Sequence, residues 1–189
     1  MVFFLMKIID AMVDDGLCLI MPGESYVAAI LMVAMAAGLI LYSDFCASFF
    51  AALVLECWAN GKVDCIEFQF AGVIWLVLYG IRFFSETFTH KLVDMLAMFI
   101  LGYIEECLHD VFDYDTVNST IPNKLIGYIA EHRLVMIITQ IPLAFLRGYC
   151  TGSILLLLAH DYGYESGRIA STHILKWKFN QQSAQSKCN

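Results

Sequence analysis

The sequence predicts an all-α, polytopic integral membrane protein, on the strength of its composition and of long apolar runs. Hydrophobic residues make up 60% of the 189 residues, and charged residues only 15%. A soluble domain carries about 25% charged residues, because polar groups have to cover a surface that faces water. The mean hydropathy of +0.70 is therefore typical of a chain whose surroundings are lipid.

The apolar residues gather in runs of helical length. Residues 25–43 form an uncharged run of 19 residues, close to the ~20 that cross a bilayer. Every other apolar run contains or adjoins an ionisable residue. Together they predict about six membrane-embedded helices, over residues 25–43, 44–59, 66–84, 88–108, 125–146 and 148–160.

The two ends of the chain differ from this membrane-embedded part. Residues 1–22 predict an amphipathic helix, because Lys7, Asp10 and Asp14 fall on one stripe among apolar side chains. This helix is expected to end at Pro22 and either to lie in the membrane interface or to pack against the bundle. Residues 161–189 are interpreted as a polar C-terminal tail with a flexible end. The whole chain, 1–189, is treated as one helical domain, with its membrane helices between residues 25 and 160.

The distribution of lysine and arginine orients the predicted helices, because cytoplasmic or matrix-facing loops carry an excess of positive residues. Six crossings place eight positive residues on the face that holds both termini, and three on the opposite face. If residues 134–159 form one long helix instead, the split becomes six against five and favours no orientation. We therefore expect six crossings, with both termini on the positive face of a bacterial or organellar inner membrane.

Charge and cysteine usage exclude several classes of protein. A net charge of −7 argues against a nucleic-acid partner, which a basic surface would have to bind, and makes an anionic membrane surface no obvious target. The seven cysteines are scattered and form no C-x-x-C pair, so we expect them to be packing residues rather than zinc or redox sites. Complete nucleotide-binding and serine-hydrolase motifs are missing as well.

An acidic patch follows one apolar run, at residues 102–115, and contains five carboxylates and His109. Glu106 and His109 form an E-x-x-H pair, which places both side chains on one helix face. Di-iron bundles need this pair twice, whereas the chain contains it once. The patch is therefore a solvated helix end, a subunit contact, or a metal or proton site. The candidate metal ligands are Glu106, His109, Asp113, Asp115, His132 and His160.

Three further charges lie within or beside apolar runs: Asp44, Asp94 and Arg147. A charge at the centre of a bilayer costs roughly 2.5–3.5 kcal/mol, so such a residue normally faces a partner, a cavity or water. Arg147 lies at an expected helix break and is predicted to extend to the interface. The other two suggest an ion path or a subunit contact.

Small residues at a spacing of four predict close helix packing. Ala144, Gly148 and Gly152 would leave one helix face smooth, so that a second helix backbone could approach it.

The function that these features favour is a non-enzymatic small subunit of a larger membrane complex, with lipids and other membrane subunits as its partners. No cofactor is predicted; a metal ion or a bound lipid is the most that the residues suggest. Two alternatives stay open. One is a membrane-embedded, metal-dependent hydrolase or oxidoreductase that uses the acidic patch. The other is a small ion or proton channel or transporter.

Overall fold

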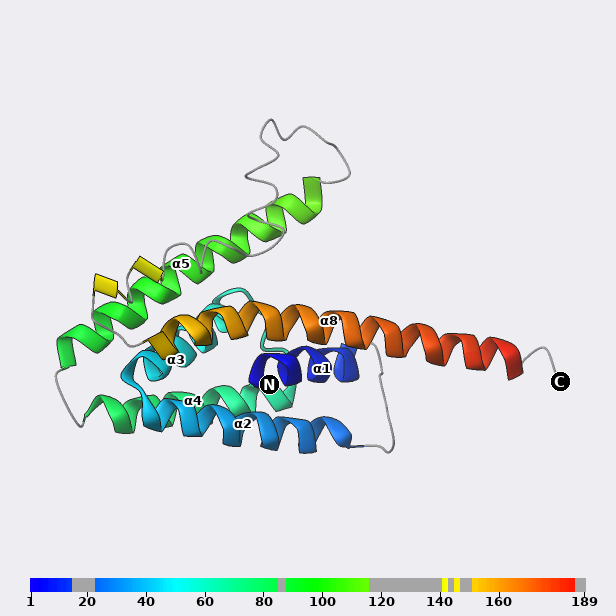
Figure 1. Ribbon diagram of the computed structural model, residues 1–189, viewed down its shortest axis with the longest axis horizontal. Coiled ribbons are helices and arrows are strands. Elements are labelled where there is room, and N and C mark those ends of the chain that lie inside the picture. Colours follow the sequence, from blue (N-terminus) through cyan, green and yellow to red (C-terminus); the bar gives the residue numbers. More distant parts are fainter. Residues whose placement is uncertain (15–22, 85–87, 116–140, 143–144, 147–150, 186–189) are drawn as a thin grey trace.

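The computed structural model describes residues 1–14, 23–84, 88–115, 141–142, 145–146 and 151–185. All of its elements in this part of the chain are α-helices (Figure 1): α1 (Val2–Asp14), α2 (Glu24–Tyr42), α3 (Asp44–Ala59), α4 (Ile66–Phe83), α5 (Phe88–Asp115) and α8 (Thr151–Gln185). The all-α prediction is confirmed for these residues. Most of the helix predicted over 125–146 lies outside them, so its existence stays a prediction.

Helix α3 lies at the centre of the bundle and contacts α2, α4, α5 and α8. Apolar side chains occupy all of its faces, and Phe45, Phe49 and Phe50 are almost completely buried. A helix that is apolar all round has no face to offer to water and is expected inside a bundle. The sequence run of 44–59 thus becomes the core helix.

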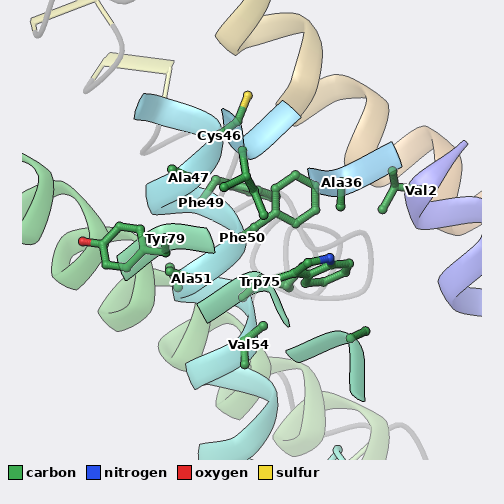
Figure 2. Packing of buried hydrophobic residues seen from close by; sticks show 14 of the residues in the cluster. Val2, Ala36, Cys46, Ala47, Phe49, Phe50, Ala51, Val54, Trp75 and Tyr79 are labelled. Carbon is green, nitrogen blue, oxygen red and sulfur yellow. The ribbon is translucent and has the colours of Figure 1, made fainter. Parts of the chain in front are cut away.

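Aromatic rings hold the neighbouring helices to α3. The ring of Phe50 lies 5.0 Å from that of Trp75 on α4 and 5.8 Å from that of Phe3 on α1, measured between centroids. Figure 2 shows Phe50 and Val54 of α3 around the Trp75 indole. Such aromatic pairs contribute about 0.5–1.5 kcal/mol beyond the area that they bury, so α1 and α4 are fixed at the same point of α3.

Contacts along α3 set the directions of its neighbours. Asp44, at the start of α3, contacts Lys91 near the start of α5 and Arg82 at the end of α4. Glu56, near the end of α3, lies against Gly102, farther along α5. Helices α3 and α5 therefore run parallel, whereas α4 runs antiparallel to α3.

The end of α3 is closed by a Schellman motif. The Gly61 N–H donates to the Trp58 carbonyl at 3.1 Å, and the Lys62 N–H donates to the Cys57 carbonyl at 2.8 Å. Gly61 has φ +66°, a left-handed conformation that costs a residue with a Cβ roughly 1 kcal/mol. The motif fixes the direction in which Lys62 leaves the helix.

Helices α2 and α4 are long and apolar enough to cross a membrane. They correspond to the predicted runs 25–43 and 66–84. Only 28% and 22% of their residues, respectively, are buried inside the described bundle. Their apolar surface is therefore left mostly facing outward.

Helix α8 joins two segments that the sequence analysis separates. Its 35 residues, about 52 Å at 1.5 Å per residue, continue from the expected apolar run of 148–160 through most of 161–189. Residues 180–185, which were expected to be flexible, belong to this helix. The contact with α1, described below, stabilises the first half of this helix, and no proline interrupts the residues that follow it.

Candidate functional site

A cavity of about 140 Å³ lies where α1, α3, α4, α5 and α8 meet. A water molecule occupies about 30 Å³ in the liquid, so the cavity has room for a few waters. Apolar side chains such as Leu53 and Trp75 line part of it. The ionisable side chains among its described lining residues are Lys7, Asp10, Cys57, Glu56, Lys62, Glu105, Glu106, His160 and Tyr164.

Three buried carboxylates reach this cavity from α3 and α5. Glu56 is 8% exposed, Glu105 5% and Glu106 3%. Glu56 can lie against α5 because Gly102 stands opposite it: a Cβ at that position would come within 2.1 Å of the Glu56 Oε2 atom. The missing side chain of Gly102 is thus what admits a carboxylate between the two helices.

Lys62 forms an ion pair with Glu106 at the mouth of the cavity. Removing a carboxylate from water costs several kcal/mol unless a cation or hydrogen-bond donors compensate it. The Lys62 side chain is 40% exposed, whereas that of Glu106 is 3% exposed. The lysine therefore extends from solvent toward a buried partner.

The α1 and α8 side of the cavity has its own polar contacts. Lys7 pairs with Asp10, and its Nζ lies 5.3 Å from the centre of the Tyr164 ring. Burial lowers the pKa of Lys7, but the hydrogen bond to Asp10 and the charges of Tyr164 and Asp10 outweigh it, so the pKa is raised overall. The His160 ring packs against the Phe3 ring at 4.6 Å between centroids.

The structure brings two of the six candidate metal ligands to one place. Glu106 and His160 both line this cavity. His109, Asp113 and Asp115 lie in α5, but their side chains fall outside the described set, as does the whole of His132. Among the described residues, no group of three or more His, Cys, Asp or Glu side chains is placed to hold a metal ion. The metal site stays a prediction.

A second polar cluster lies where α3 and α5 begin and α4 ends. The Asp44 Oδ1 atom is 2.9 Å from Arg82 Nε and 3.2 Å from Lys91 Nζ. The buried Lys91 carbonyl accepts hydrogen bonds from Ser48 and Tyr79, at 3.3 and 3.4 Å. Asp44 is one of the charges for which the sequence requires a partner, and it has two within the chain.

The remaining intramembrane candidates have different outcomes. Asp94 is completely buried, one turn after Lys91 on α5. Asp94 thus lies in the interior of the bundle, which is where a charged residue of a membrane helix is expected to lie when it has a partner. Arg147 lies outside the described residues, so its extension to the interface stays a prediction.

The small-residue contact that the structure shows is not the predicted one. Ala144 and Gly148 lie outside the described residues, and Gly152 lies in the first turn of α8. Instead, Gly163 and Gly167 of α8 face α1. A Cβ on Gly167 would lie 2.9 Å from the Lys7 Cβ and 3.0 Å from the Phe4 carbonyl oxygen.

Sequence reasoning missed several residues of these sites, although some carried a signal. Gly163 and Gly167 form a second G-x-x-x-G, within the segment interpreted as a polar tail. Glu56 and Glu67 are isolated carboxylates in apolar runs, and Glu67 accepts a 2.7 Å hydrogen bond from Ser25 of α2. Nothing local marks Gly102, because its role depends on a residue 46 positions earlier in the chain.

Comparison with known proteins identifies no relative. No protein-family description, curated protein or solved structure is significantly similar to this chain.

Proposed function

We propose that this chain is an integral membrane protein of about six membrane-embedded helices, and that it acts as a non-enzymatic small subunit of a larger membrane complex. One observation supports this most directly: within the described residues, aliphatic side chains cover much of the outside of the bundle, whereas six charged side chains are buried beside its apolar core.

The contrast is large on neighbouring elements. On α4, Val77 and Ile81 are 56% and 61% exposed. On α5, Asp94 and Glu106 are 0% and 3% exposed. In water this arrangement would forgo about 25 cal/mol for each Å² of apolar surface left uncovered and would also bear the cost of burying charge. In lipid the first cost disappears, because the hydrocarbon is as apolar as the aliphatic side chains. A charged side chain is then less unfavourable inside the bundle than on the face that meets the hydrocarbon.

Two other kinds of apolar helix do not fit α4. The core helix of a soluble protein is mostly buried, whereas most of α4 faces outward. A signal sequence lies at the N-terminus, whereas α4 begins at residue 66. Lipid or the helices of another membrane subunit would cover such a face.

The way in which the charges are paired supports the proposed subunit role. Asp44 and Glu106 have cationic partners within this chain, so these pairs hold the bundle together. The apolar faces of α2, α4 and α5 then remain as the surfaces through which the protein meets its surroundings. Neighbouring transmembrane helices pack on such faces by shape rather than by charge.

The passage of a proton or small cation is a second candidate, and the cavity is the observation that favours it. Buried Glu56, Glu105 and Glu106 line a space large enough for water inside a helical bundle. Ion pathways through membranes use such carboxylates. The path would then run past these glutamates rather than past the predicted Asp44 and Asp94.

The experiment that tests the first proposal is purification from the native membrane in a mild detergent, after extraction of the membranes with alkaline carbonate. We expect the protein to resist carbonate and to elute as a large particle with constant partners. A carbonate-soluble protein would contradict the membrane assignment. A small particle with stoichiometric metal, lost in His109→Ala, would favour the enzyme alternative instead.

The second candidate has its own readout, a proton or cation flux into liposomes that contain the purified chain. Glu105→Gln should abolish the flux, whereas Glu67→Gln, a buried carboxylate outside the cavity wall, should keep it. Equal flux in both variants and in empty liposomes would rule this candidate out.

A further inference from the structure

The second half of α8 exposes basic and aromatic side chains together. Arg168 and Lys176 lie on one i, i+4 row of the helix, and Ile169, His173 and Trp177 lie on the adjacent row. All five are exposed. We call these five residues, together with the partly exposed Lys178 next to Trp177, the cationic face of α8.

The charge of this region is opposite to that of the rest of the chain. All 18 acidic residues precede residue 166, whereas Arg168, Lys176, Lys178 and Lys187 follow it. The net charge of −7 therefore conceals a positive C-terminal segment. The Arg168 guanidinium is paired with Glu165, at 2.9 Å between Nε and Oε2, so the lysines carry most of the charge that this segment offers to a partner. The overall charge makes an anionic membrane surface no obvious target, whereas this segment carries the sign of charge that such a surface attracts.

The cationic face lies where α8 leaves the bundle. Gly163 and Gly167 pack on Phe3, Phe4 and Lys7 of α1, so the two helices run parallel from there. In Figure 1 the later part of α8 continues beyond the end of α1 and projects from the bundle. Trp177 and Phe179 on this part are 59% and 70% exposed.

We propose that the cationic face of α8 binds anionic phospholipid headgroups at the surface of the membrane that holds the bundle. The proposal rests on the membrane assignment made above. Lysine and arginine attract phosphate and the other anionic groups of the cytoplasmic leaflet, the side on which positive residues gather. An acidic protein would also attract the lysines.

The aromatic side chains decide in favour of lipid. A tryptophan ring is amphipathic and is enriched at the level of the headgroups, with its indole N–H toward the polar region and its ring toward the acyl chains. Trp177 is flanked by Lys176 and Lys178 in the sequence. When the indole lies at the level of the headgroups, two ammonium groups are therefore brought close to the lipid phosphates. This combination is typical of an interfacial anchor.

Trp177 itself provides the test. The full-length protein is reconstituted into vesicles that contain phosphatidylcholine and phosphatidylglycerol, with bromine on the acyl chains of one lipid or of the other. Bromine quenches the fluorescence of a tryptophan that lies next to it. Quenching that is present in the wild type and absent from Trp177→Phe therefore reports the lipids next to Trp177. We expect stronger quenching by brominated phosphatidylglycerol than by brominated phosphatidylcholine, and a loss of this preference at high salt.

The charge dependence is tested with a matched pair of variants. Lys176→Gln with Lys178→Gln should lower the preference for phosphatidylglycerol, by up to about five-fold for each lysine. Lys176→Arg with Lys178→Arg keeps the charge and should keep the preference. The proposal would be overturned if both lipids quench the wild type equally, or if neither lipid quenches Trp177. It would also be overturned if the glutamine variant keeps the full preference for phosphatidylglycerol.

The same vesicles separate this proposal from the one on which it rests. If carbonate removes the protein from the vesicles, the membrane assignment has failed. If the protein stays embedded and shows no preference for phosphatidylglycerol, the cationic face has failed and the membrane assignment stands.

Discussion

At the scale of single residues, this protein combines buried carboxylates with specific compensating neighbours. Glu106 is almost inaccessible and pairs with Lys62, which a Schellman motif directs toward it. Glu56 occupies space that Gly102 leaves open. Each of these two contacts joins residues from different helices or loops. A substitution of one residue therefore changes the surroundings of the other.

Replacing Lys62 with methionine tests this dependence. The variant leaves Glu106 buried without its ammonium partner, so we expect the free energy of unfolding in detergent to fall by about 1–2 kcal/mol, less than for a fully buried pair because Lys62 is partly exposed. Adding Glu106→Gln should recover part of the loss. A double-mutant cycle that shows no coupling would contradict the pair.

At the scale of elements, the contact between α1 and α8 is decided by two glycines. Gly163 and Gly167 let α1 approach α8 closely enough that a Cβ on either would press on the α1 backbone or side chains. This contact lies at the beginning of a segment whose composition suggests a tail. It also places Lys7 and Asp10 beside His160 and Tyr164 at the cavity.

Gly167→Ala is expected to loosen this contact. Overpacking of a close contact costs about 1–3 kcal/mol, and the neighbouring Phe4 carbonyl cannot move independently of α1. Thermal unfolding of the purified protein would report the loss. Gly80→Ala is the control, because a Cβ there meets nothing within 4 Å and alanine favours a helix over glycine by up to about 1 kcal/mol. An equal change in stability in both variants would contradict the close contact at Gly167.

The end of α5 raises the question of whether the acidic patch is in contact with water. Cys107 lies among its carboxylates and is exposed, whereas Cys65 is buried. Burial raises the pKa of Cys65, so less reactive thiolate is present at neutral pH and the fraction rises as the pH is raised. We expect a membrane-impermeant maleimide to label Cys107 quickly, and Cys65 slowly but faster at higher pH.

Variants that keep one cysteine each make this comparison clean. Labelling of Cys107 from one side of intact vesicles would place the patch at a solvated helix end on that side. No labelling from either side, with full labelling in detergent, would place it within lipid or within a subunit contact.

At the scale of the whole molecule, the largely aliphatic outside of the described bundle leads to a prediction that depends on whether lipid or water surrounds it. Val77 is 56% exposed on α4. If lipid covers it, Val77→Asp should cost roughly 2.5–3.5 kcal/mol and lower the amount of protein in the membrane fraction. If water covers it, the change should stay within about 0.5 kcal/mol.

Val77→Ala provides the control for this variant, since it removes side-chain volume without adding charge. Similar yields of both variants in the membrane fraction would contradict the membrane assignment, independently of whether the protein has partner subunits.

The sequence by itself determined the helical class and several helix boundaries. It predicted a helix over 44–59, and α3 spans Asp44–Ala59; it predicted 66–84, and α4 spans Ile66–Phe83. These boundaries are local, because Ser43 caps α3 by accepting from the Cys46 N–H and an unbroken apolar run fills each helix. The sequence also indicated that Asp44 needs a partner, because a charge within an apolar run is costly in a membrane.

Only the tertiary structure decided which residues meet. Lys62 pairs with Glu106, 44 positions later, and Gly167 receives the backbone of Phe4 from the other end of the chain. No periodicity or spacing in a single sequence carries such pairings, because they depend on the direction and register of whole helices. The same reason applies to α8: its composition does not show that Gly163 and Gly167 pack on α1, and it is this packing that holds α8 against the bundle before its polar second half projects.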